Sequence, residues 1–272
     1  ITSKTISLLH LPPNKQKQRE KAIRAFLECK AGWEKLKEPS TAECIIFSKD
    51  RALQLHALLS TFQEKVAPVV PVHVLYASSS PSHQKAYDDV IAALDRENIR
   101  FIRQQNEYSF KYDLLKILAS LTGDMLFFLV DDILFTEPVD LRDIVKFDPD
   151  EFVFSLRMGQ NLSRCYVLQR PQALPEFADP PAHSSDKIVW QWEKGELDWG
   201  YPLSVDGHFF ARREMTAMAV LLSFSAPNSF EDQLQIFKPF FINRRGIGYQ
   251  KSRIVNIPCN RVQTERKNLS GN

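Results

Sequence analysis

Between residues 44 and 130 the sequence alternates apolar runs of strand length with longer stretches whose apolar residues recur at helical spacing. The runs of strand length are Cys44–Phe47, Val72–Tyr76, Ile99–Arg103 and Met125–Val130. The stretches between them place apolar side chains on one helical face: Leu55, Leu58, Leu59 and Phe62, then Tyr87, Val90, Ile91 and Leu94, then Leu114, Ile117, Leu118 and Leu121. Strands and helices that alternate in this way predict βαβ units and a mostly parallel sheet.

The last of these runs, Met125–Val130, is apolar at every position. This pattern is typical of a central strand whose sheet is covered by helices on both faces. The predicted fold class is therefore α/β, with an open, mostly parallel sheet flanked by helices over residues 41–150. In such sheets ligands bind beyond the carboxyl ends of the strands, so the residues that follow each strand are the first candidates for a site.

Residues 1–40 are interpreted as an N-terminal helical extension. Residues 15–37 are rich in charge, and their apolar side chains fall roughly on one helical stripe: Ile23, Phe26, Leu27 and Trp33. The pattern predicts an amphipathic helix that packs on the main domain. Peripheral association with a membrane stays open as an alternative, although the interspersed acidic residues favour a solvated outer face.

Residues 151–260 are interpreted as the second half of the same domain, and residues 261–272 as a polar tail. Phe152–Leu156 has the length and composition of a further strand. A short helix is expected after Asn228, and Pro239 is expected to end it. The rest of this half is aromatic and irregular, which excludes both a simple linker and a repeat of the first half.

The charge of the chain limits the partners that it could bind, and its cysteine content indicates the cellular compartment. The 35 Lys and Arg against 33 Asp and Glu leave a net charge of +2, which gives no electrostatic basis for nucleic-acid binding. No apolar run is long enough to span a bilayer. The four cysteines are scattered without a CxxC pair, which argues against a disulfide scaffold or a zinc site and favours a reducing, cytoplasmic location.

Two adjacent carboxylates, Asp131 and Asp132, directly follow the apolar run that ends at Val130. Adjacent carboxylates at the mouth of a buried strand repel each other unless a cation or hydrogen-bond donors neutralise them. Oxygen ligands of this kind suit Mg²⁺ or Mn²⁺, and Mg²⁺ is commonly held by one or two carboxylates together with substrate phosphates. The alternative is that the pair only stabilises the following turn.

The order of three motifs adds context to this pair. Cys44-Ile-Ile-Phe-Ser-Lys-Asp-Arg51, Tyr76-Ala77-Ser78 and Phe-Leu-Val-Asp-Asp-Ile133 follow one another along the predicted strands. Together they resemble the GT-A glycosyltransferases, in particular the family 2 type that use nucleotide-diphosphate sugars. The resemblance covers residues 43–135 well and residues 200–240 more loosely.

The resemblance implies a metal-dependent site that binds a nucleotide-sugar donor, most simply a UDP-sugar. Asp132 looks like the ligand of Mn²⁺ or Mg²⁺, and Asp131 looks like the residue that contacts the ribose or shares the metal. The candidates for nucleotide binding follow the first two strands or begin the third helix: Ser48, Asp50, Arg51, Tyr76, Ser78 and Lys111. Each of these also has an ordinary alternative as a surface charge or a helix cap.

A second acidic pair, Glu231-Asp232, lies at the start of the helix expected after Asn228. It resembles the Glu-Asp pair of inverting GT-A enzymes, which supplies the base that deprotonates the acceptor hydroxyl. Asp232 is the preferred base, with Glu231 as its neighbour. The alternative is a capping box, because acidic residues are favoured at a helix N-terminus.

The stretch between the two acidic pairs supplies the predicted acceptor site for a sugar or glycan. Trp199 and Tyr201 offer aromatic faces that suit stacking on a sugar ring. His208 is a further candidate, either for the acceptor or for a metal, although a lone histidine is more often a hydrogen-bonded core residue.

Two other functions remain compatible with the sequence. A nucleotidyltransferase that makes a sugar nucleotide could share the fold and the metal, but a glycine-rich loop would be expected after the first strand. Residues 48–53 contain no glycine. A non-catalytic module that binds nucleotide sugars is the second alternative.

Overall fold

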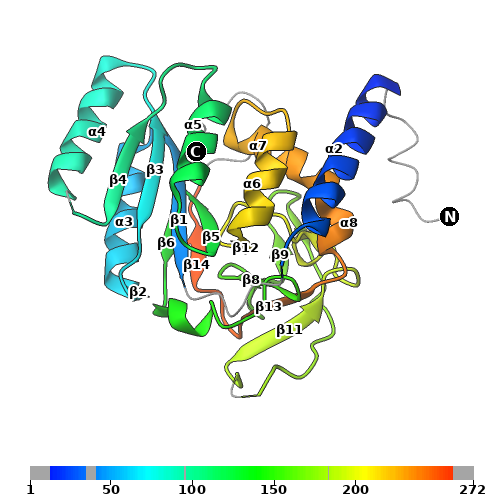
Figure 1. Ribbon diagram of the computed structural model, residues 1–272. Helices are drawn as coiled ribbons and strands as arrows, with labels where there is room; N and C mark the ends of the chain where they lie inside the picture. The colour runs from blue at the N-terminus through cyan, green and yellow to red at the C-terminus, as the bar shows by residue number, and fades with distance from the viewer. Residues whose placement is uncertain (1–12, 35–40, 95, 183, 260–272) are drawn as a thin grey trace.

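A five-stranded sheet forms the centre of the molecule (Figure 1). The computed structural model describes residues 13–34, 41–94, 96–182 and 184–259. In the order β12–β5–β1–β3–β4, the strands of the sheet are β12 (Phe209–Ala211), β5 (Met125–Val130), β1 (Ala42–Lys49), β3 (Val72–Ala77) and β4 (Ile99–Arg103). The pairs β5–β1, β1–β3 and β3–β4 are parallel, and only β12 runs antiparallel to its neighbour β5. The predicted α/β class and its mostly parallel sheet are confirmed.

Helices cover both faces of this sheet. Three helices connect the parallel strands in the order in which these follow one another along the chain, as the alternation predicts: α3 (Ala52–Lys65), α4 (Pro81–Ala93) and α5 (Phe110–Ser120). Residues of α3 and α4 pack in one hydrophobic cluster, whereas residues of α5, α6 (Arg212–Leu221) and α7 (Pro227–Leu234) pack in the other. The sheet is therefore the middle layer of three.

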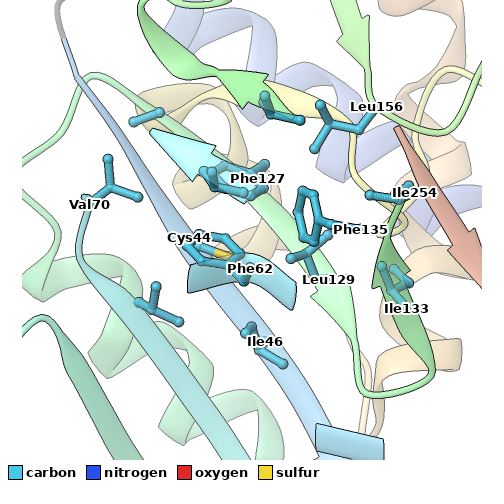
Figure 2. Packing of buried hydrophobic residues seen from close by; sticks show 14 of the residues in the cluster. Cys44, Ile46, Phe62, Val70, Phe127, Leu129, Ile133, Phe135, Leu156 and Ile254 are labelled. Atoms are coloured by element: carbon cyan, nitrogen blue, oxygen red, sulfur yellow. The ribbon is translucent and has the colours of Figure 1, made fainter. Parts of the chain in front are cut away.

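Strand β5 is buried on both faces because successive side chains of a strand point to opposite sides. Phe127 and Leu129 join the α3–α4 cluster, and Leu126 and Phe128 join the other cluster. Figure 2 shows the first of these clusters, in which residues of β5 lie with Cys44 and Ile46 of β1 and Phe62 of α3. Because Phe127 and its neighbours are solvent-inaccessible, polar groups have no place along the strand and are confined to its ends.

The connections create a switch point in the sheet between β1 and β5. From β1 the chain adds β3 and then β4 on one side, and it then returns to place β5 on the other side of β1. The segments that leave β1 and β5 therefore diverge above a crevice at the carboxyl ends of the strands, which is where open α/β sheets bind ligands.

The second half of the chain builds a smaller sheet and completes the large one. Phe152–Leu156 is confirmed as a strand, but β8 (Phe152–Ser155) belongs to a separate sheet of order β11–β13–β8, with β11 (Lys187–Gln191) and β13 (Arg245–Tyr249). The remaining short elements are β2 (Val66–Ala67), β6 (Ile133–Phe135), β7 (Val139–Asp140), β9 (Arg164–Cys165), β10 (Arg170–Pro171), β14 (Ile254–Asn256), and the 3₁₀ turns Leu141–Asp143, Leu197–Gly200 and Gln235–Phe237.

The helix expected after Asn228 is present as α7, but its predicted end at Pro239 is wrong. After α7 the chain continues through the 3₁₀ turn 235–237 into α8 (Lys238–Phe241), with Pro239 in the first turn of α8. A proline at that position costs nothing, because the first N–H groups of a helix have no partner inside the helix.

The N-terminal helix α2 (Pro13–Ala31) packs on the second hydrophobic cluster, beside α6 (Figure 1). Phe26 is fully buried, with its ring 4.9 Å from that of Phe237 and 5.9 Å from that of Trp33. Leu27 is 46% exposed, so its place in the predicted stripe is wrong. Part of the predicted extension (1–12 and 35–40) and the polar tail lie outside the described residues, and no described helix has the length and apolarity needed to cross a membrane.

Neighbouring variants in α2 test this packing. Phe26→Ala should lower the free energy of unfolding by about 3–5 kcal/mol, because it removes a buried ring and leaves a cavity. Leu27→Ala, one residue further on, should change it by less than about 0.5 kcal/mol, because the side chain faces solvent. Urea unfolding followed by circular dichroism measures both. Equal effects of the two substitutions would show that α2 does not pack through Phe26.

Candidate active site

A cleft of about 1610 Å³ lies above the carboxyl ends of the parallel strands. The end of each strand contributes to its lining: Lys49 of β1, Ala77 of β3, Arg103 of β4 and Val130 of β5. The opposite wall comes from the second half of the chain, including the residues that precede β12 and the start of α7. The site is thus formed by segments that are far apart in the sequence.

Arg51 joins the two strands at the switch point. Its Nη1 lies 3.0 Å from Oδ1 of Asp131 and 3.2 Å from Oδ2 of Asp132, and its side chain is only 13% exposed. The other oxygen of Asp131 accepts a hydrogen bond from the backbone N–H of Lys49 at 3.1 Å. Burial still outweighs these contacts and raises the pKa of Asp131 to about 6. The segment after β1 is therefore bound to the acidic pair after β5 by charge and by hydrogen bonds.

Asp132 is the more accessible member of the pair. Its side chain is 13% exposed, against 5% for Asp131. Besides Arg51, it accepts a hydrogen bond from Nδ2 of Asn256 at 3.4 Å. Asn256 ends β14, which pairs with β6 directly after the acidic motif. Both carboxylates therefore line the cleft and hold neighbouring segments together, and Asp132 is the more exposed of the two.

Asp206 and Glu231 add two further carboxylates to the cleft. Oε1 of Glu231 accepts a hydrogen bond from the backbone N–H of Val205 at 3.1 Å. Burial raises the pKa of Asp206 to about 7, and the charge of Glu231 raises it as well, whereas Arg157 acts in the opposite direction. Burial also raises the pKa of Glu231. Asp206 and Glu231 therefore interact with each other and with the guanidinium of Arg157 in this part of the cleft.

Gly207 brings Asp206 to this position. Its φ of +75° is accessible at little cost only to glycine, and a Cβ there would lie 2.5 Å from Cδ1 of Ile254. Its N–H donates to the carbonyl of Phe128 at 2.8 Å. The turn therefore lies directly against β5, close to the acidic pair that follows it.

The chain was compared with known proteins by family, by sequence and by structure. No family model matches it. It is 24% identical over 175 residues to the bifunctional glycosyltransferase pgtA of Dictyostelium discoideum, which is 58% of this chain and 22% of pgtA. The chain therefore spans less than a quarter of that relative's length.

Solved structures share the architecture at lower identity. TarS 1–349 of S. aureus in complex with UDP-GlcNAc aligns with a TM-score of 0.51 and 13% identity, over 79% of this chain and 57% of that one. GalNAc-T7 with UDP, GalNAc and Mn²⁺ aligns with a TM-score of 0.51 and 12% identity, over 86% of this chain and 44% of that one. The chain has the GT-A glycosyltransferase fold.

The GT-A cleft offers a ligand set that suits a divalent cation. Carboxylate oxygens are the donors that Mg²⁺ and Mn²⁺ prefer, and Asp132 presents them next to Asp206. The charge of Asp132 contributes to the raised pKa of Asp206, so the two carboxylates interact across the cleft. In the part of the chain that the structure describes, no three His, Cys, Asp or Glu side chains are grouped closely enough to hold an ion by themselves. An ion here would share its coordination with substrate phosphates, as Mg²⁺ commonly does.

The GT-A cleft brings together about half of the residues expected from sequence. Those that line it are Ser48, Arg51, Ser78, Asp131, Asp132 and Glu231. Ser48 is hydrogen-bonded to the hydroxyl of Tyr87 at 2.6 Å, and Ser78 accepts a hydrogen bond from Nη2 of Arg103 at 3.3 Å. Arg51 is not a surface charge, because it is paired with the acidic motif.

Three residues that were predicted to bind the nucleotide do not line the cleft. Tyr76 is buried beneath the cleft with its ring 4.6 Å from that of Tyr87, so it is not available to stack on a base. The carboxylate of Asp50 accepts the N–H of Ser79 at 2.6 Å and does not line the cleft. Lys111 donates to the carbonyl of Leu222 at the end of α6, which places its ammonium away from the strand ends.

The predicted acceptor residues form part of the core instead of lining the cleft. Trp199 is fully buried, and its ring centroid lies 5.0 Å from that of Trp190. His208 is 1% exposed, and its Nδ1–H donates to the carbonyl of Pro202 at 3.0 Å. Tyr201 is half-buried and is not among the residues that line the cleft. Trp199 is large and apolar enough to be drawn into the second cluster, whatever else it could bind.

In the second acidic pair, Glu231 and not the preferred Asp232 is the residue that lies at the cleft. Glu231 lines the cleft, whereas Asp232 does not. The alternative that the acidic pair forms a capping box is wrong. The residue that caps the start of α7 is Ala226, and the side chain that hydrogen-bonds to its backbone is that of Ser229. Both acids lie too far into the helix to cap it.

Several cleft residues were missed by sequence analysis. Arg103 could have been found, because it is the last residue of a predicted parallel strand. Asp206 carried a weaker signal, the glycine that follows it. Arg157 directly follows the strand predicted over Phe152–Leu156, so it had the same kind of signal as Arg103. Asn256 had none, because it ends β14 and only the tertiary structure brings β14 to the cleft.

The burial of His208 gives a pH dependence that can be measured. Burial lowers its pKa from 6.5 to about 4, so between these values the unfolded chain binds a proton that the folded chain does not. The contribution of His208 to stability is therefore fully present above pH 6.5 and is lost as the pH falls toward 4. Each pKa unit corresponds to about 1.4 kcal/mol, so the loss should reach roughly 3 kcal/mol.

Urea unfolding of the wild type and of His208→Gln between pH 7.5 and pH 4 isolates this effect. The wild type should be the more stable protein at pH 7.5, and its advantage should shrink by roughly 3 kcal/mol at pH 4, because glutamine does not titrate. A stability difference that stays constant across this range would contradict the burial of a neutral His208.

Proposed function

We propose that the chain is a GT-A glycosyltransferase that moves a sugar from a nucleotide-diphosphate donor, most simply a UDP-sugar, to an acceptor hydroxyl with inversion at the anomeric carbon. One observation carries the proposal: both acidic motifs, Asp131-Asp132 and Glu231, face a single cleft at the switch point of a GT-A fold. The structural relatives support the donor class, since they were solved with UDP-GlcNAc and with UDP, GalNAc and Mn²⁺.

The nucleotide would bind over the ends of β1, β3 and β4. Ser48, Lys49, Ser78 and Arg103 line that part of the cleft and offer hydroxyl, backbone and guanidinium donors to a ribose or a phosphate. Asp132 would hold Mn²⁺ or Mg²⁺, which would offset the charge that develops on the departing diphosphate. Asp131 is the less accessible of the two and is also bonded to the N–H of Lys49, so we assign the metal to Asp132.

Glu231 is the proposed general base, which reverses the preference for Asp232. Its carboxylate is fixed by the N–H of Val205 and faces the cleft, and its raised pKa suits a group that must accept a proton. In the reaction the acceptor oxygen forms a bond to the anomeric carbon, while the bond from that carbon to the diphosphate oxygen breaks. The acceptor proton passes to Glu231, and the bonding electron pair leaves with the nucleotide.

Matched substitutions in α7 test the base. Glu231→Gln should lower the rate of sugar transfer by about 10²- to 10⁴-fold, because it removes proton transfer but keeps the shape of the side chain. Asp232→Asn should stay within a few-fold of the wild type, because its side chain does not line the cleft. Transfer rates are measured by NMR, which also reports the anomeric configuration of the product. A larger loss in Asp232→Asn, or a retained configuration, would overturn the assignment.

Calorimetry tests the metal site without requiring turnover. UDP binding to the wild type should be strengthened by Mn²⁺, and Asp132→Ala should abolish that Mn²⁺ dependence while the far-UV circular dichroism stays unchanged. Asp143→Ala is the control, because Asp143 is an acid outside the cleft that pairs with Lys146. If Asp132→Ala binds UDP with Mn²⁺ as tightly as the wild type does, the proposed ligand is wrong.

One assay separates the proposal from its rivals. The protein is incubated with a panel of UDP- and GDP-sugars and Mn²⁺, with and without sugar acceptors. Donor hydrolysis or transfer supports a glycosyltransferase. Exchange that depends on pyrophosphate indicates a nucleotidyltransferase, and binding without either reaction indicates a non-catalytic module.

A further inference from the structure

A short hairpin forms one part of the cleft wall. We call residues 162–172 the hairpin segment: β9 and β10 pair within it, with Cys165 opposite Arg170. The turn between them carries three large apolar side chains that are unusually exposed: Tyr166 at 45%, Val167 at 66% and Leu168 at 55%. Tyr166 and Val167 line the cleft, whereas Leu168 does not. Exposed aromatic and aliphatic groups at the edge of a cleft are typical of a binding surface.

The core residues Asp198 and Trp199 hold this segment in place. The indole N–H of Trp199 donates to the carbonyl of Leu162 at 3.1 Å. Asp198 exchanges two hydrogen bonds with Gln172, one from its own N–H and one to its carboxylate, both 3.2 Å long. The thiol of Cys165 lies 3.8 Å from the same carboxylate. Both ends of the hairpin segment are therefore fixed, and its turn is left open to the cleft.

Asp198, which holds the hairpin segment, is also connected through Arg157 to the proposed base, Glu231. Nη2 of Arg157 lies 3.4 Å from Oδ2 of Asp198, and the Arg157 side chain is 17% exposed. Arg157 lines the cleft, and its charge acts on both Asp206 and Glu231. The hairpin segment is thus attached to the part of the cleft that holds Glu231. It comes from the second half of the chain and contains none of the strand-end residues proposed to bind the nucleotide.

We infer that the hairpin turn is the acceptor site, and that the sugar ring carrying the reactive hydroxyl stacks on Tyr166 with Val167 beside it. The inference rests on the proposed function, because the acceptor must lie next to the base that takes its proton. A tyrosine ring offers a rigid apolar face to the C–H face of a pyranose and a hydroxyl at its edge. Asp198 and Trp199 are positioning residues in this site. Trp199 was expected from the sequence to bind the acceptor itself, and instead it supports the hairpin segment that would do so.

Variants of the turn test the inference with methyl α- and β-pyranosides of glucose, galactose, mannose and N-acetylglucosamine as probes. Tyr166→Ala should weaken binding of the preferred pyranoside about 3- to 10-fold, which is the range expected for loss of one aromatic contact. Tyr166→Phe should stay within about twofold, because it keeps the ring face. Leu168→Ala is the matched control, because it is equally exposed in the same turn but outside the cleft. Binding is measured by saturation-transfer NMR titration and as the acceptor KM.

Donor hydrolysis in the absence of an acceptor separates the inference from the proposed function. Hydrolysis should be unchanged within about twofold in the control Leu168→Ala and should remain detectable in Tyr166→Ala, because the donor site and Glu231 are intact. If the wild type neither hydrolyses the donor nor transfers its sugar, the proposed function fails. If the wild type does hydrolyse or transfer, the hairpin inference alone fails in either of two cases: Tyr166→Ala binds the pyranosides as tightly as the wild type does, or the wild type binds none of them.

A second pair of variants tests the positioning role. Trp199→Phe removes the hydrogen bond to Leu162 and should raise the acceptor KM severalfold, with donor KM and hydrolysis unchanged. Trp192→Phe is the control, because Trp192 is equally buried in the same cluster and no bond from its indole to the hairpin segment is present. Assays are run below the melting temperature of both variants. The same change in acceptor KM in both would show a general loss of packing and overturn the positioning role.

Discussion

The burial of β1 and β5 on both faces is the constraint from which the rest of the structure follows. Strands that pack between two layers of helices carry little charge along their length, because a buried charge without a partner is too costly. The buried Glu43 at the start of β1 has its partner in His73. Ionised groups near these strands are therefore concentrated at the ends, where the chain leaves the sheet. The strand order places those ends side by side at the switch point, so the ion pairs of Arg51 with Asp131 and Asp132 form where the two segments diverge.

The electrostatics of the cleft follow from this crowding. Around the two acidic motifs, the carboxylates of Asp131, Asp132, Asp206 and Glu231 interact with the guanidinium groups of Arg51 and Arg157. The guanidinium groups offset part of the negative charge, and burial and mutual repulsion raise the pKa of three of the carboxylates. A cleft of this kind favours a cation and a proton-accepting group in the same space, which is what transfer from a nucleotide-diphosphate sugar requires.

The two halves of the chain are interdependent. β12 from the second half completes the sheet of the first, and the N-terminal helix α2 packs on the cluster that also contains the three buried tryptophans. That aromatic cluster fixes the hairpin segment through Trp199, and it also contains Phe230 and Leu234 of α7, the helix that carries Glu231. Core packing and the geometry of the proposed acceptor site are therefore parts of one arrangement, and the residues that stabilise the fold also set the shape of the cleft.

The sequence by itself determined the strands and helices of the first half, the mostly parallel sheet and the acidic pair at the end of β5. These features are local: apolar runs of strand length, helical patterns and the residues that follow a strand can be recognised without knowing what lies across the fold. Only the tertiary structure decided which side chains meet. It paired Arg51 with both aspartates, drew Trp199 and His208 into the core, turned Glu231 rather than Asp232 to the cleft, and brought in Arg157. The physical reason is that burial, ion pairing and orientation depend on neighbours distant in the chain, and a one-residue difference along a helix turns a side chain by about 100°.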